Sequence, residues 1–222
     1  METTTRQPDK GAGAAASRTE TATDQAALHV VLLGLMGTGK TVVGQALAAH
    51  LALPFSDNDR AIMDATGLTA REIRELRGVG VLHTLESQHL LDAVDRPASS
   101  VIGAAASVVE DERCRTALAG AGVLPIWLRA RAETLAERFH NEAHRPLFGD
   151  SPLVFFRDQI AVRSPLYSAL GLAVVDVDGC TVGEVTARLV AAADGLLAGK
   201  RSSRSRTIQL AHESPASESL SD

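Results

Sequence analysis

The sequence predicts an α/β fold, a three-layer α/β/α sandwich built on a parallel sheet, and two observations support this class. Short aliphatic runs alternate along the chain with longer segments whose apolar residues recur at helical spacing. The first run, from Leu28 to Leu33, is almost continuously aliphatic, which is typical of a strand buried on both faces of a parallel sheet. Parallel strands need crossover connections, so we expect helices to cover both faces.

The expected elements follow in order along the chain. Strands are assigned to the short aliphatic runs, which cover residues 28–33, 53–56, 101–102, 123–128 and 173–177. Helices are assigned where apolar residues lie three and four positions apart, which is the case in residues 41–51, 61–66, 69–76, 81–94, 113–119, 132–139, 153–170 and 182–197. In the first helix, for instance, Val43, Leu47 and Leu51 are spaced by one helical turn. Residues 140–152 have neither pattern, and we expect a loop there.

One folded domain is expected over residues 27–199, with a disordered tail on each side. Residues 1–26 and 200–222 are rich in small and polar residues without a period, so they bury too little apolar surface to offset the entropy of ordering. The second tail begins with three closely spaced arginines. They could form a phosphorylatable or nucleic-acid-contacting segment, but so few cations release little counterion, which favours a merely solvated tail.

The composition excludes several classes of protein. The formal net charge is -5 at pH 7, so the chain as a whole lacks a basic surface for nucleic acid or for an anionic membrane. No apolar run is long enough to cross a bilayer, and the N-terminus lacks the pattern of a secretory signal. The two cysteines, Cys114 and Cys180, are expected as reduced thiols. We therefore expect a cytoplasmic protein that binds neither nucleic acid nor a membrane.

A phosphate-binding loop is the strongest motif in the sequence. Residues 34–41, Gly-Leu-Met-Gly-Thr-Gly-Lys-Thr, match G-x-x-x-x-G-K-[ST] between a predicted strand and a predicted helix, which is the context that the motif requires. Its glycines allow consecutive backbone N–H groups to surround phosphates, and the helix N-terminus adds its dipole. The residues expected to bind ATP are Gly37, Thr38, Gly39, Lys40, Thr41 and Val42. Lys40 would bridge the β- and γ-phosphates, and the Thr41 hydroxyl would bind Mg²⁺.

The loop alone does not distinguish kinases from other nucleotide-binding proteins. A domain of this length leaves no room for helicase or transporter modules. The sequence also lacks an Asn-Lys-x-Asp segment that would read guanine, which argues against a GTPase.

An acidic pair follows the second predicted strand. Asp57 and Asp59 come at its carboxyl end, which faces the ligand crevice in an open α/β sheet. Asp57 would serve Mg²⁺, and Asp59 would accept the proton of an attacking hydroxyl. The alternative is structural, with Asp57 beginning a turn and Asp59 capping the next helix. The adjacent phosphate loop favours the functional interpretation.

Together these motifs resemble those of the shikimate kinase family, over about residues 29–196. Residues 34–44 are similar to its phosphate loop and first helix, so the fold implied is of the P-loop kinase type. Asp57 and Asp59 are similar to its D-x-D motif, whose first carboxylate serves the magnesium shell and whose second contacts the acceptor alcohol. Residues 66–73 resemble its lid-like acceptor-binding segment.

Further positions carry the resemblance into the second half of the chain. Glu86 is similar to the glutamate that helps to hold an arginine of the acceptor segment. Arg138 and Arg145 are similar to two lid arginines, of which one lies near adenine and one near the transferring phosphate. Arg163 begins an R-x-P-x-Y segment that ends at Tyr167, and the resemblance implies that its guanidinium pairs with the acceptor's carboxylate.

Two departures from the family pattern fall on the acceptor side. His83 stands where a second carboxylate-binding arginine is expected, and a neutral imidazole cannot supply a two-point fork. Three interpretations of His83 stay open: it binds a carboxylate when protonated, it faces a different substrate, or its role is structural or vestigial. Residues 105–107, Ala-Ala-Ser, replace a triple glycine, so three Cβ atoms would intrude on the acceptor and any position with positive φ would be strained.

The resemblance implies an ATP- and Mg²⁺-dependent enzyme of aromatic amino acid biosynthesis that phosphorylates shikimate or a related carboxylated polyol. The catalytic residues would be Lys40, Asp59 and Arg145, the substrate would contact Asp59, His83 and Arg163, and the metal would contact Thr41 and Asp57. The family implies a monomer. Two alternatives remain open, a paralogue acting on a cyclitol or sugar acid and a nucleotide-binding regulatory protein without efficient transfer.

Overall fold

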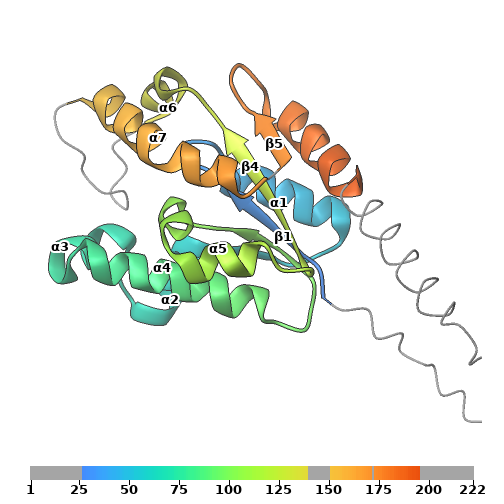
Figure 1. Cartoon of the computed structure of the whole chain (residues 1–222), viewed down its shortest axis with the longest axis horizontal. Coiled ribbons are helices and arrows are strands. Elements are labelled where there is room, and N and C mark those ends of the chain that lie inside the picture. The colour runs from blue at the N-terminus through green and yellow to red at the C-terminus, as the bar shows by residue number, and fades with distance from the viewer. Residues whose placement is uncertain (1–26, 140–150, 172, 196–222) are drawn as a thin grey trace, which may run out of the picture.

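Five parallel strands form the central sheet, in the order β2-β3-β1-β4-β5 (Figure 1). The computed structural model describes residues 27–139, 151–171 and 173–195. The strands are β1 (His29–Leu33), β2 (Phe55–Asp57), β3 (Ser100–Gly103), β4 (Val123–Arg129) and β5 (Ala173–Asp176). The predicted α/β class with a parallel sheet is confirmed.

Helices connect the strands and cover both faces of the sheet. They are α1 (Lys40–Leu51), α2 (Asn58–Thr66), α3 (Ala70–Arg77), α4 (Val79–Val94), α5 (Glu112–Leu118), α6 (Ala132–Arg138) and α7 (Pro152–Ala169), and residues 182–195 are also helical. Alternate residues of β1 face opposite layers, with Leu32 in the core under α1 and the helix 182–195, and Leu33 in the core under α4, α5 and α7. This alternation explains why the first strand is aliphatic from Val30 to Leu33.

Several boundaries differ from the sequence expectation. The helix expected from residue 61 begins at Asn58 because the carboxylate of Asp57 caps it, and α7 begins at Pro152 because Ser151 caps it. A short 3₁₀ helix at Ala106–Glu110 was not expected. Most of the expected loop at 140–152, the last residues of the final helix and both predicted tails lie outside the described residues.

A small apolar cluster ties α2, α3 and α4 together beside the sheet. Ile62, Ile73 and Leu82 are buried at 3%, 0% and 5% relative exposure, one from each helix. The N-terminus of α3 has a capping box between Thr69 and Glu72, in which each side chain bonds to the other's backbone N–H. The three helices therefore form a unit that stands next to the carboxyl end of β2.

Parallel pairing brings the carboxyl ends of the strands to one edge of the sheet. The register pairs Leu32 with Gly103 and Asp57 with Gly103, so the loop after β1 lies near the end of β2. On the other side, Arg129 at the end of β4 pairs with Asp176 at the end of β5. In the described residues, no helix is both long and apolar enough to cross a membrane, and both cysteines are free thiols.

Candidate active site

The phosphate loop leaves β1 and returns directly into α1. Gly37 and Gly39 have φ values of 85° and 88°, which L side chains rarely adopt, and Gly34 lies so close to β4 that a Cβ would meet the Leu128 carbonyl oxygen at 2.5 Å. A Cβ on Gly39 would meet nothing within 4 Å, so there is open space at the start of α1. No side chain caps this helix, and the N-terminus of a helix favours anions.

Lys40 and Thr41 begin α1 and reach in different directions. The Lys40 Nζ donates to the carbonyl oxygens of Gly34 and Leu35, at 2.8 and 3.1 Å. The Thr41 hydroxyl donates to Oδ2 of Asp57 at 2.7 Å. The ammonium group thus lies over the loop, and the hydroxyl is joined to the end of β2.

Asp57 caps the helix that follows β2 and also bonds to the start of α1. Its Oδ1 accepts from the backbone N–H groups of Asp59 and Arg60, at 3.1 and 3.3 Å, so Asp57 caps α2 and Asp59 does not. Its Oδ2 accepts from Thr41. Asp59 lies in the first turn of α2 with an exposed carboxylate.

The oxygen atoms of Thr41 and Asp57 are suitable ligands for a magnesium ion whose other ligands include phosphate oxygens. Magnesium prefers oxygen ligands and is commonly bound by one or two carboxylates together with substrate phosphates. Within the described part of the chain, there is no group of three or more His, Cys, Asp or Glu side chains that could hold a metal ion.

A buried carboxyl group lies beside the part of the site that contains Asp59, His83 and Arg163. We call this part the acceptor end, because the family resemblance assigns these residues to the acceptor. Glu86 of α4 is buried, and it accepts a short hydrogen bond from the hydroxyl of Ser107. Burial raises the pKa of Glu86 to about 7, and the Ser107 hydrogen bond opposes that shift. Glu86 therefore holds Ser107 in this chain, where the family resemblance suggested that it would hold an arginine.

The Ala-Ala-Ser segment adopts ordinary backbone conformations. Among the described residues other than glycine, positive φ occurs at Ala52, so residues 105–107 carry no strain of that kind. The strain expected for a positive φ therefore does not arise at these positions. Together with Ala104, these residues line the active-site cavity described below.

Arg163, on α7, lines the same cavity as residues 105–107. Its Nε donates to Oε1 of Glu110 at 2.7 Å, and its Nη1 donates a short hydrogen bond to Gln159 one turn earlier. The side chain is 13% exposed. One turn later, the Tyr167 hydroxyl donates to the Ala106 carbonyl oxygen at 3.2 Å, so this residue of the R-x-P-x-Y segment fixes the 3₁₀ helix against α7.

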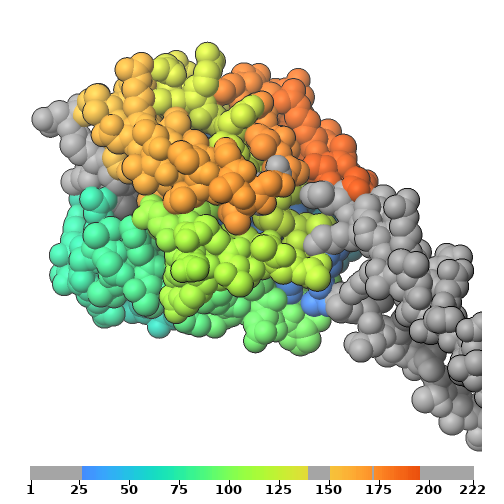
Figure 2. Space-filling view, in the orientation of Figure 1, coloured from blue at the N-terminus to red at the C-terminus, as the bar shows by residue number. Residues whose placement is uncertain are grey.

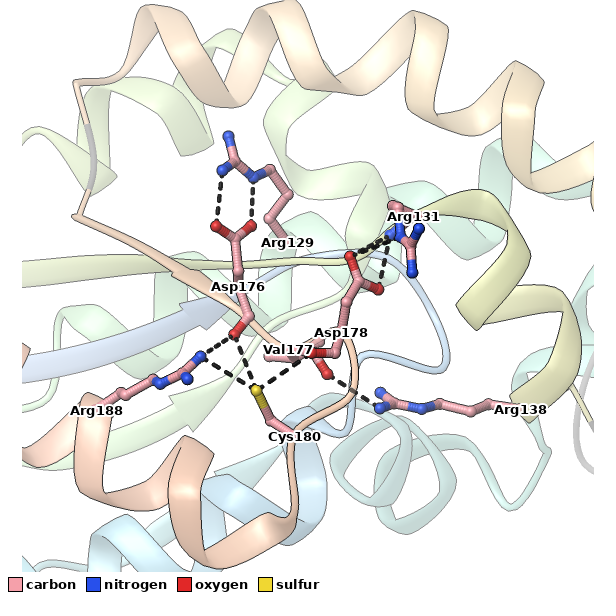
Figure 3. Close-up of polar contacts among 8 residues, drawn as sticks. All are labelled: Arg129, Arg131, Arg138, Asp176, Val177, Asp178, Cys180 and Arg188. Carbon is pink, nitrogen blue, oxygen red and sulfur yellow. Dashed lines mark hydrogen bonds and ion pairs between the residues drawn. The ribbon is translucent and has the colours of Figure 1, made fainter.

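Arg138 ends α6 and joins two loops. Its guanidinium donates to the Gly37 carbonyl oxygen at 3.4 Å. It also donates to the Val177 carbonyl oxygen at 3.1 Å, as Figure 3 shows. The phosphate loop and the segment after β5 are thus held on either side of one cation.

Further arginines fix the segment that follows β5. Arg129 makes two hydrogen bonds to the carboxylate of Asp176, at 2.6 and 2.8 Å, and the Arg131 backbone N–H donates to Asp178 (Figure 3). Arg188 donates to the Asp176 carbonyl oxygen at 2.9 Å. The hydrogen bond from Arg129 is the largest cause of the lowered pKa of Asp176. The sequence analysis did not identify these residues.

Most of the predicted site residues line one cavity of about 580 Å³. They are Gly37, Gly39, Lys40, Thr41, Val42, Asp57, Asp59, His83, Arg138 and Arg163. Thr38 is not among its lining residues, since its side chain is 3% exposed and its hydroxyl donates to the Leu35 carbonyl oxygen. Arg145 lies outside the described residues. In Figure 2, α3 (teal) and α7 (yellow to orange) lie at the left-hand end of the molecule, α7 above and α3 below.

The cavity also includes residues that sequence reasoning missed, among them Arg74 and Gln159. A signal for Arg74 existed in the sequence, because it directly follows Ile73, an apolar residue of the amphipathic segment. The sequence pattern therefore placed Arg74 next to the buried face of its helix, but it did not show which elements lie opposite that face.

Comparison with known proteins agrees with this geometry. Residues 36–194 match the sequence model of the shikimate kinase family. The shikimate kinase of Ruegeria pomeroyi is 33% identical over 171 residues, which cover 75% of this chain and 86% of that protein. The shikimate kinase of Streptomyces coelicolor is 34% identical over 157 residues, covering 71% and 90%.

Solved structures give the same result. The shikimate kinase of Acinetobacter baumannii in complex with shikimate is 25% identical, with a TM-score of 0.68 over 74% of this chain and 91% of that one. The Aquifex aeolicus shikimate kinase, at 24% identity and a TM-score of 0.65 over 77% and 98%, shares the fold.

Proposed function

This chain belongs to the shikimate kinase family, and we propose that it transfers the γ-phosphoryl group of ATP to a hydroxyl group of shikimate. The observation that carries the proposal is that most of the predicted site residues share a cavity of about 580 Å³. The phosphate loop lines one part of it, and Asp59, His83 and Arg163 line another. A nucleotide and a small acceptor could therefore meet inside it.

The phosphate end would bind the nucleotide through the loop amides and Lys40. No side chain caps the amides at the start of α1, so these amides would donate to phosphate oxygens. The Lys40 ammonium group already lies over the loop, so it would reach the phosphates with little rearrangement. Thr41 and Asp57 would hold magnesium, which when bound neutralises charge on the β- and γ-phosphates. Arg138, fixed between two loops, would contact the nucleotide next to the phosphate loop.

Asp59 would orient the acceptor hydroxyl and accept its proton. As the acceptor oxygen bonds to the γ-phosphorus, the bond from that phosphorus to the leaving ADP oxygen breaks, and the hydroxyl proton passes to the carboxylate. Charge that spreads over the γ-phosphate oxygens would be stabilised by Lys40 and, as the family resemblance implies, by Arg145.

Arg163 would bind the carboxylate of shikimate. The hydrogen bonds that it makes to Glu110 and Gln159 hold the guanidinium in place, which lowers the conformational entropy lost when the substrate binds. Tyr167 and the 3₁₀ helix would support this arrangement from behind, because Tyr167 is fully buried and donates to Ala106.

An acceptor screen tests the proposal. ADP release would be followed with ATP and Mg²⁺ while shikimate, quinate, gluconate and a cyclitol are offered in turn, with an Asp59→Asn variant as the matched control. We expect shikimate to give the largest kcat/KM and Asp59→Asn to lose most of it. Faster turnover of a cyclitol or of gluconate would point to a different acceptor, and ATP binding without acceptor-stimulated release would point to a regulatory protein.

A further inference from the structure

We infer that Arg74 is a specificity-determining residue, which supplies a second positive charge to the acceptor's carboxylate in place of the arginine expected at position 83. The inference rests on the proposed function, since it concerns how the same site would recognise shikimate. It follows from three features of the acceptor end of the cavity, which concern His83, Arg163 and the packing of α3.

His83 is poorly suited to bind a carboxylate as a cation. The imidazole is half-buried on α4, and burial is the largest cause of its lowered pKa. Glu110 raises the pKa, while the nearby charges of Arg163 and Arg74 lower it further. At neutral pH the ring is therefore uncharged, and it offers one N–H donor at most.

Arg163 is partly engaged by the protein itself. Its Nε donates to Glu110, and its Nη1 donates to Gln159. A carboxylate that approaches either edge of the guanidinium meets a nitrogen that already has an internal partner. The negative charge of Glu110, at 2.7 Å, also offsets part of the charge that Arg163 would present. One more cation would restore the attraction.

The packing of α3 on α4 places Arg74 where that cation is needed. Ile73 and Leu82 are buried in one apolar cluster, and the residue that follows each of them, Arg74 and His83, lines the active-site cavity. Arg74 lies in the last turn of α3 and is half-buried, so its position is set by the cluster beneath it. The cavity thus has a guanidinium from α3, next to His83, and another from α7.

In this arrangement, two arginines on separate helices bind the acceptor's carboxylate, Arg74 on α3 and Arg163 on α7. A guanidinium is always charged and donates in a planar fork, so it matches a carboxylate better than an ammonium or an imidazole does. Removal of Arg74 should weaken binding of an acceptor with a carboxylate and leave binding of an uncharged acceptor almost unchanged. A merely structural role would affect both acceptors equally.

The test compares shikimate with its methyl ester, which lacks the charge, in steady-state kinetics of the full-length protein. The variants are Arg74→Met, Arg74→Lys and the matched control Arg77→Met, which removes an equal charge from the same helix turn at an exposed position outside the cavity. Thermal unfolding of each variant verifies that the fold is intact.

We expect Arg74→Met to raise KM for shikimate by about 10- to 100-fold, with KM for ATP unchanged and with little change for the ester. Arg74→Lys should have a smaller effect, Arg77→Met none, and the double variant Arg74→Met/His83→Arg should regain part of the loss. Unchanged KM for shikimate in Arg74→Met, or equal losses with acid and ester, would overturn the assignment of Arg74 alone. Absence of shikimate turnover by the unmodified protein would overturn the proposed function and this assignment with it.

Discussion

Replacement of Glu86 by glutamine should remove a pH dependence of stability. Glu86 is 9% exposed, and its pKa rises from 4.5 to about 7. The raised value means that the folded state holds the proton more tightly than the unfolded chain does. Because a pKa difference of one unit corresponds to about 1.4 kcal/mol, the shift of roughly 2.5 units represents about 3 kcal/mol.

The sign of the effect follows from the direction of the shift. The protonated carboxyl group contributes its full stability below pH 4.5, that contribution declines as the pH rises, and it is lost above about pH 7. Glutamine carries no charge at any of these pH values and can still accept the hydrogen bond from Ser107. The stability of Glu86→Gln relative to the unmodified protein should therefore increase by roughly 2–3 kcal/mol between about pH 5 and pH 8.

Urea denaturation at several pH values measures this difference. The free energy of unfolding of both proteins would be extrapolated from the same range of urea concentration, since the slopes should agree if the unfolded states are alike. Glu137→Gln, at an exposed position on α6, is the matched control and should show no comparable trend. A constant difference between Glu86→Gln and the unmodified protein across the pH range would refute the reasoning.

Three further predictions concern the phosphate loop and the core beneath it. Lys40→Met should reduce ATP turnover by about a thousandfold or more, as measured by ADP release, because an uncharged side chain cannot stabilise charge on the γ-phosphate; undiminished turnover would contradict the assignment. Thr41→Val should raise the magnesium concentration needed for half-maximal activity, because it removes the hydroxyl that is bonded to Asp57, and an unchanged requirement would count against a metal ligand. Gly44→Ala should destabilise the fold by about 1–3 kcal/mol in urea denaturation, because its Cβ would meet the Phe55 ring at 2.4 Å. Gly80→Ala, where nothing lies within 4 Å, is the control and should be neutral or slightly stabilising.

The sheet and the phosphate loop could be predicted because their signals are local. A strand buried on both faces is mostly aliphatic, as β1 is after His29, so it was recognisable from its sequence alone. The loop was recognisable because glycine is required where φ is positive, as at Gly37 and Gly39. The start of α2 at Asn58 was missed because the same Asp57 serves as a helix cap and as the partner of Thr41, and a residue pattern does not show both.

The acceptor end could not be predicted from the sequence because its contacts join distant residues. The ion pair of Arg163 with Glu110 spans 53 positions, and the hydrogen bond of Ser107 with Glu86 spans 21. The sequence did show that position 83 and residues 105–107 depart from the family pattern. The residues that surround these positions depend on packing. Packing brings Arg74 into the same cavity as His83, and it places Ser107 within hydrogen-bond distance of Glu86.

Transfer of label from γ-³²P-ATP to shikimate tests the central claim most directly, namely that one cavity brings the terminal phosphate and the acceptor hydroxyl together. With Mg²⁺ and the full-length protein, labelled shikimate phosphate should accumulate in proportion to the ADP released. The Lys40→Met variant should form almost none. Label that remains in ATP, or that appears as inorganic phosphate at a rate independent of shikimate, would contradict the account.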